Sequence, residues 1–334
     1  MTEWLHSTIL HIAGLFPQDT WLAYPHNVRA LVAIAIVSVI CGSVGSLVVG
    51  NRMSFFSDAL AHCAFAGITL GFIVALIVGA HPESILIPIV MLTFGVIVGV
   101  AIAYVRERTG LANDTIIGVF FAFAVGFGGM LFGALQQRTL NPESFLFGSL
   151  LFVYEADILA LIILGLVLAL VLERRYNQFV LASFSPSLAR SRQVPIRWCN
   201  YLFIILLALI VNLCLRAVGA LLINAMLVVP AATAANLCRN LRQMFWCSVL
   251  LSLGAGVTGL WISNTARLNL GRGQELEFAP AGTIVVLSVI LFFVSVAWKA
   301  LRDRPPQLSA ALVAAGRQPE NVSSIGEPTP PSGA

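Results

Sequence analysis

Long apolar segments separated by short polar stretches fill most of the chain. An α-helix needs about 20 residues to cross the ~30 Å hydrocarbon core of a bilayer. Windows of that length and character predict nine membrane spans, at residues 29–50, 54–79, 85–105, 114–135, 148–172, 199–215, 219–237, 244–264 and 281–299. Because such a window can also be a broken or re-entrant helix, we expect an all-α, polytopic membrane protein with about eight or nine transmembrane helices.

Composition agrees with this pattern and excludes several kinds of site. Hydrophobic residues make up 59% of the 334-residue chain, charged residues make up 10%, and the mean hydropathy is +0.93, far too apolar for a soluble globular protein. The six cysteines stand singly, without the CxxC spacing of a structural zinc site, and we interpret them as core residues. Lys299 is the only lysine, so a GxxxxGK phosphate loop is excluded. If ATP drives this protein, another subunit binds it.

Basic residues are distributed unevenly between the two sides that the predicted spans connect. One side holds fourteen of the nineteen: Arg52, Arg106, Arg108, Arg174, Arg175, Arg190, Arg192, Arg197, Arg239, Arg242, Lys299, Arg302, Arg304 and Arg317. The positive-inside rule assigns this side to the cytoplasm. The C-terminus is therefore expected inside and, with nine spans, the N-terminus outside.

The two ends of the chain differ from the transmembrane domain, which we place at residues 29–300. In residues 1–28, apolar residues from Trp4 to Phe16 recur at helical spacing, which predicts a segment lying in the membrane interface. It is not typical of a secretory signal, because it carries Glu3, no positive charge at its start and no cleavage site. Residues 301–334 are rich in Pro, Ser, Gly and Ala and predict a disordered cytoplasmic tail.

The second span contains an acid and an imidazole four residues apart, Asp58 and His62, so both lie on one face of a helix. An aspartate at a helix centre in lipid costs ~2.5–3.5 kcal/mol on insertion scales, which favours a functional position. Counted from Arg52, the helical rise places the pair roughly 9 and 15 Å into the bilayer. We predict two metal ligands; a structural Asp–His pair is the alternative. A small-residue stripe for close helix packing runs beside them: Ala59, Cys63, Gly67 and Gly71.

Other polar residues are weaker candidates for lining a cation path. They are His81 and Glu83 in a short external loop, Asn224 near Pro230 in the seventh span, and Glu275 and Glu277 in the last external loop. Pro230 removes a helical hydrogen-bond donor and leaves a carbonyl that can line a path. Solvated loops and a purely structural kink are the alternatives.

The longest predicted cytoplasmic loop is residues 173–198. Ser185 followed by Pro186 is typical of a helix start, so a short helix is expected from Ser187 to Arg192. That helix could dock on a partner. A basic loop that contacts anionic lipid headgroups is the alternative.

Six ordered blocks of sequence carry a family resemblance. They are RMSFFSDALAHCAFAGITLG, TIIGVFFAFAVGFG, SFLFGSLL, SFSPSLA, VGALLINAMLVVPAATAANL and PAGTIVVL. In this order and at these spacings they resemble the permease subunit of bacterial metal-ion ABC importers, the zinc, manganese and iron class. The resemblance covers roughly residues 30–300.

The resemblance implies an ABC importer permease fold in a bacterial plasma membrane. It assigns the metal site to Asp58 and His62, and the contact with the ATPase to the SFSPSLA segment: Ser185, Pro186, Ser187, Leu188 and Ala189. The implied partners are a second copy of the chain, two copies of an ABC ATPase, and an external metal-binding protein. We expect no enzymatic activity, no permanently bound cofactor and no nucleic-acid partner.

Two departures from the manganese-type pattern favour zinc as the transported ion. The chain reads HCAFAG after residue 61, where manganese-type members tend to have HAVLPG, and SFSP rather than SFDP. Asp58 and His62 cannot complete the four-ligand shell that zinc prefers, so water or other residues must contribute. An Asp/His pair would also bind Mn²⁺ or Fe²⁺.

Two other classes of protein remain as alternatives. An ion-coupled secondary transporter would need no ATPase, but the hydropathy shows no internal repeat that would support it. An intramembrane hydrolase is disfavoured, because neither an HExxH motif nor a second acid within the same span accompanies His62.

Overall fold

Nine long apolar helices dominate the computed structural model, which describes residues 2–14, 17, 20–79, 85–135, 153–269 and 275–302. Their bounds are α2 Pro25–Gly50, α3 Phe56–Val78, α4 Leu86–Arg108, α5 Asn113–Ala134, α7 Glu155–Phe184, α9 Ile196–Val218, α10 Ala220–Leu237, α11 Leu241–Thr265 and α12 Pro280–Arg302. Each is long and apolar enough to cross a membrane. The all-α prediction and the number of spans are therefore confirmed.

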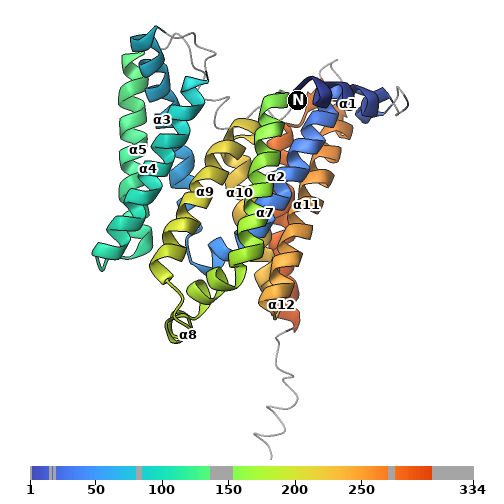
Figure 1. Cartoon of the computed structure of the whole chain (residues 1–334). Coiled ribbons are helices and arrows are strands. Elements are labelled where there is room, and N and C mark those ends of the chain that lie inside the picture. Colours follow the sequence, from blue (N-terminus) through green and yellow to red (C-terminus); the bar gives the residue numbers. More distant parts are fainter. Residues whose placement is uncertain are drawn as a thin grey trace, which may run out of the picture.

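Shorter elements lie at the two ends of the bundle. They are α1 Thr2–Gly14, the 3₁₀ turn η1 Trp21–Ala23, α8 Pro186–Ser191, and an antiparallel ribbon of β1 Arg267–Asn269 with β2 Glu275–Glu277. Figure 1 shows α1 and α8 at opposite ends of the bundle. We call the end that carries Arg52, Arg106 and α8 the basic end. The ribbon was not predicted, and joins α11 to α12 at the other end.

The fifth predicted span, 148–172, differs most from the structure. Its first residues lie outside the described ranges, and α7 begins at Glu155 and continues to Phe184. The window ended at residue 172 because Glu173, Arg174 and Arg175 are charged, yet these residues favour a helix. The buried side chain of Phe179 packs this extension of α7 against the rest of the protein. Most of the predicted loop 173–198 is therefore helical, as the end of α7, α8 and the start of α9.

The helices form two groups joined by α9. In Figure 1, α3, α4 and α5 stand together on one side, while α2, α7, α10, α11 and α12 form the larger group. Helix α9 packs against α4 in the first group and α7 in the second, and α3 also reaches α10. The start of α3 therefore lies where the two groups meet.

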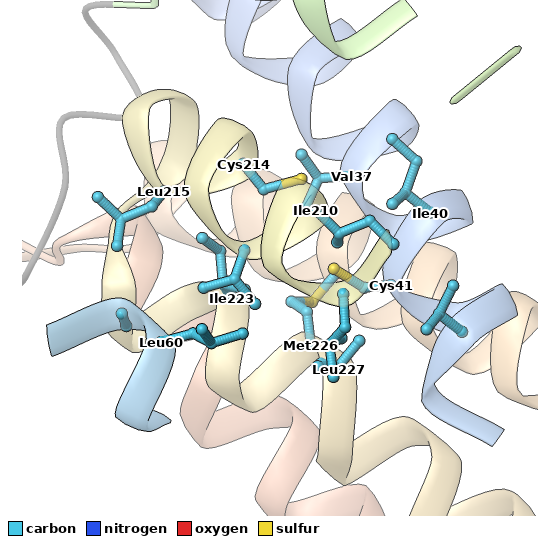
Figure 2. Close-up of a cluster of buried hydrophobic side chains, with 14 of the residues drawn as sticks. Val37, Ile40, Cys41, Leu60, Ile210, Cys214, Leu215, Ile223, Met226 and Leu227 are labelled. Atoms are coloured by element: carbon cyan, nitrogen blue, oxygen red, sulfur yellow. The ribbon is translucent and has the colours of Figure 1, made fainter. Parts of the chain in front are cut away.

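A buried cluster fixes this junction. Figure 2 shows side chains of α2, α9 and α10 meeting around Cys41 and Cys214, two buried free thiols, with Leu60 of α3 in the same cluster. Leu60 is fully buried. Removing a buried leucine side chain typically costs about 2–5 kcal/mol. Because Leu60 lies between Asp58 and His62 in the sequence, this packing holds the start of α3 against α10.

The small-residue stripe of α3 packs against α4. A Cβ atom added at Gly67 would lie 2.9 Å from the Cα of Met91, and one at Gly71 would lie 3.1 Å from the Cα of Ile87. Larger residues would push the two helices apart. The predicted close approach along the stripe is therefore confirmed, with α4 as the neighbour.

Candidate metal site

Asp58 and His62 lie together near the start of α3, as their spacing predicts. Asp58 is in the first turn, where the helix dipole favours a negative charge. Its Oδ1 atom lies 3.9 Å from His62 Nδ1. The two side chains are 41% and 28% exposed, so the pair is open on one side.

The imidazole of His62 is oriented by its own helix. Its Nδ1 lies 3.0 Å from the backbone carbonyl oxygen of Asp58, a distance at which an Nδ1–H donates a hydrogen bond. In the neutral ring this contact leaves Nε2 without a proton and able to bind a metal ion. The ring also packs edge-on against Phe121 of α5, with 4.6 Å between ring centroids. Sequence reasoning missed Phe121, because nothing local in an apolar span marks its contact with His62.

Asn224 of α10 also reaches the pair, through a hydrogen bond to Asp58. Its Nδ2 donates a hydrogen bond to Asp58 Oδ1, with 2.7 Å between the two atoms. Its Oδ1 is buried and has no hydrogen-bond partner within the described part of the chain. The structure therefore brings three of the sequence candidates, Asp58, His62 and Asn224, to one place.

Within the described part of the chain, His62 is the basic residue nearest to the Asp58 carboxylate. Among the described residues, no arginine or lysine lies within ion-pair distance of its carboxylate. The neighbouring groups are an imidazole, a neutral amide and the positive end of a helix dipole. The described residues also contain no group of three or more His, Cys, Asp or Glu that could hold a metal ion, so the pair by itself is an incomplete shell.

The remaining path candidates do not join this site in the described structure. His81 and Glu83 lie outside the described residues. Glu275 and Glu277 lie on β2, where their backbones pair with Asn269 and Arg267 of β1. The ribbon that holds them connects α11 to α12, and no hydrogen bond or ion pair in the described structure joins either residue to Asp58.

The predicted short helix is present at the basic end. It runs from Pro186 to Ser191, with Ser185 at the N-cap position, although no capping hydrogen bond from the Ser185 side chain occurs within the described structure. Ser187 and Leu188 are exposed, whereas Ala189 is fully buried. Only part of the segment is therefore available to a partner.

A cavity of about 610 Å³ opens beside α8, where the ends of several helices meet. Arg52 and Arg106 line it together with Asn51, Ser183 and Asn200, and its lining residues include no acid. The Arg106 guanidinium donates to the sulfur of Met53, at 3.2 Å. This basic cavity was not predicted, because its residues converge from helix ends that are distant in the sequence.

Comparisons with known proteins agree with this architecture. Residues 23–299 match the model of the family described as "ABC 3 transport family". The manganese import system permease protein ScaB of Streptococcus gordonii is 31% identical over 269 residues, covering 80% of this chain and 89% of that protein. The chelated iron transport system membrane protein YfeD of Yersinia pestis is 29% identical over 304 residues, covering 90% and 94%.

A solved structure has the same overall fold. A chain of PsaBC from Streptococcus pneumoniae in complex with Fab matches with a TM-score of 0.66 and 25% identity, covering 87% of this chain and 95% of that one. The apolar helices, the extent of the family match and the coverage of the relatives all concern the same transmembrane domain. The chain therefore belongs to the ABC 3 transport family and is a multi-pass permease of the bacterial plasma membrane.

Proposed function

We propose that the metal ion carried by this ABC importer permease is Zn²⁺, and that Asp58 and His62 bind it during transport. The observation that supports this is the Asp58 carboxylate, which lies within a membrane-spanning helix beside an imidazole and an amide but, among the described residues, without an arginine or lysine. A carboxylate in lipid is costly unless a positive charge accompanies it. A transported cation would supply that charge.

The donor atoms suit a borderline transition metal. His62 presents Nε2, and Asp58 presents carboxylate oxygen, both of which bind Zn²⁺ at about 2.0–2.2 Å. Zinc prefers four ligands, so two positions must be filled by water or by residues outside the described set. The exposed fractions of both side chains leave room for those ligands.

A second copy of the chain is the proposed neighbour of α5. Helix α5, which contributes Phe121 to the site, exposes a stripe of small residues with no atom near an added Cβ within the described structure: Gly118, Gly126, Gly129 and Gly133. Such stripes allow close helix approach in a bilayer. We propose that a homodimer uses this exposed face of α5.

ATP hydrolysis is assigned to a separate subunit, two copies of which would dock at the basic end. The exposed Leu188 on α8 offers an apolar contact, and the neighbouring cavity lined by Arg52 and Arg106 offers positive charge without an internal acid. Delivery of the ion is assigned to an external binding protein at the opposite end. Both partners follow from membership of an ABC transport family.

Manganese is the second candidate ion. It is favoured by the relatives of this chain, since ScaB of Streptococcus gordonii is a manganese import system permease protein. The Asp/His pair alone discriminates poorly between divalent transition metals. Selectivity must therefore be measured rather than inferred from the ligand types.

The experiment that tests the site uses the full complex in vesicles, with the binding protein loaded with Zn²⁺, Mn²⁺ or Fe²⁺. We expect Zn²⁺ to stimulate ATPase activity and uptake the most. Asp58→Asn removes the charge and His62→Gln removes the imidazole, so each should lower uptake to background while the complex still assembles. Wild-type uptake by either variant would overturn the assignment, and a parallel loss of assembly and uptake would support a structural pair.

Docking at α8 is tested with two leucines of similar exposure at the basic end. Leu188 is 52% exposed on α8, and Leu111 is 55% exposed between α4 and α5. Leu188→Glu should reduce co-purification of the ATPase and abolish uptake, whereas Leu111→Glu should leave both unchanged. Ala189 is unsuitable for this test, because its burial means that a charge there would disrupt α8 itself. Equal ATPase binding by both variants would leave lipid contact as the role of this segment.

A further inference from the structure

Asn224 of α10 donates a hydrogen bond to the carboxylate of Asp58 on α3. This bond links the two helices directly at the candidate site. Helix α10 begins directly after Gly219, whose φ of 87° suits glycine, and Asn224 lies in its second turn. Ile223, the preceding residue, is fully buried in the cluster that also holds Leu60. The amide is therefore positioned by packing on the same two helices that it connects.

The hydrogen bond changes what Asp58 can offer to a metal ion. Nδ2 of Asn224 donates a hydrogen bond to Oδ1 of Asp58. The same carboxylate oxygen lies 3.9 Å from His62 Nδ1. The second oxygen, Oδ2, has no hydrogen bond to another described residue. A carboxylate held in this way is suited to binding an ion through one oxygen rather than two.

One-oxygen binding affects the candidate metals differently. Zinc is satisfied by few ligands in a tetrahedral arrangement, whereas Mn²⁺ is typical of octahedral, oxygen-rich sites. A carboxylate that is free to rotate and bind through both oxygens would add one oxygen ligand and favour Mn²⁺. The groups around a metal ligand commonly tune affinity by 10–100-fold through such orientation.

We propose that Asn224 is a positioning residue for metal selectivity: by holding Oδ1 of Asp58, it restricts the carboxylate to one-oxygen binding and favours Zn²⁺ over Mn²⁺. This inference rests on the proposed function of Asp58 and His62 as ligands. It assigns to Asn224 an action through Asp58, without contact between the amide and the ion.

The structure offers a matched control in Asn212 of α9. Both asparagines are in membrane-spanning helices, and each has a buried Oδ1 without a partner in the described structure. Asn212, however, donates its Nδ2 to the carbonyl oxygen of Ala208 in its own helix, at 2.7 Å. Replacing each asparagine by leucine removes an amide whose oxygen is buried, but only the change at Asn224 releases Asp58.

The test measures Zn²⁺ and Mn²⁺ dissociation constants of the assembled complex by equilibrium dialysis with each metal alone. Asn224→Leu should lower the preference for Zn²⁺ over Mn²⁺ about tenfold. Asn212→Leu should keep the wild-type ratio, and Asn224→Gln, which retains an N–H donor, should restore most of it. A wild-type ratio in assembled Asn224→Leu would overturn the inference.

A second measurement covers the case in which Asn224→Leu does not assemble. Infrared difference spectra of the wild-type complex with and without Zn²⁺ report whether a carboxylate binds through one oxygen or two. Bands that disappear in Asp58→Asn are assigned to the Asp58 carboxylate. We expect the positions of these bands to show one-oxygen binding. Two-oxygen binding would overturn the role of Asn224, whereas unchanged zinc affinity in Asp58→Asn would instead overturn the proposed metal site.

Discussion

Two places in the described part of this permease combine a histidine with a carboxylate, and they differ in whether the protein supplies a positive charge. At the end opposite the basic end, Nδ1 of His6 in α1 lies 2.9 Å from Oε1 of Glu155. The same oxygen forms an ion pair with Arg29 of α2. We call these three residues the end cluster. At the start of α3, Asp58 has His62 and the neutral amide of Asn224 instead.

The difference shows that residue types alone do not define a metal site. Arg29 neutralises Glu155, so the end cluster is complete without an ion and serves to tie α1, α2 and α7 together. Within the described residues, the Asp58 carboxylate is accompanied by His62 and the amide of Asn224 but by no arginine or lysine, and a carboxylate within a membrane-spanning helix is costly without a positive charge. We therefore expect a cation to stabilise the second arrangement more than the first.

Supplying a positive charge at the α3 site should make it resemble the end cluster. In Asn224→Lys, the ammonium group replaces the amide that contacts Asp58 Oδ1 and forms an internal ion pair. We expect uptake to fall to background while assembly remains close to wild type, because the paired carboxylate no longer attracts a metal ion. Uptake assays in vesicles, with the amount of assembled complex as the control, measure this effect. Substantial zinc uptake by the assembled variant would contradict the comparison.

Removing the positive charge from the end cluster should affect stability rather than transport. Arg29→Met keeps much of the side-chain volume but leaves Glu155, whose side chain is 20% exposed, without its guanidinium. The expected loss in free energy of unfolding is about 1–3 kcal/mol, as for other part-buried groups that lose a partner. Thermal unfolding in detergent measures it, and uptake per assembled complex should stay near wild type. A loss of uptake without a loss of stability would show that the end cluster acts in transport.

The sequence predicted that Asp58 and His62 lie together on α3, but it did not predict the contacts that other helices make with them. Asp58 and His62 are found on one face because helical periodicity is a local property. Asn224 was selected for its position near Pro230, yet its contact in the structure is with Asp58, which no local pattern could indicate. Phe121 and the cavity lined by Arg52 and Arg106 gave no signal, because each depends on helices that meet only after folding.

By itself, the sequence determined that this is an all-α membrane protein with about eight or nine apolar helices, and that an acid and an imidazole share a face inside one of them. Hydropathy and the period of the helix fix those properties, since both act over a few turns of one segment. Tertiary structure alone decided that α7 continues to Phe184, that α4 covers the small-residue stripe of α3, and that an amide from α10 holds Asp58. These features depend on which helices become neighbours, and that choice is made by side-chain packing between segments far apart in the chain.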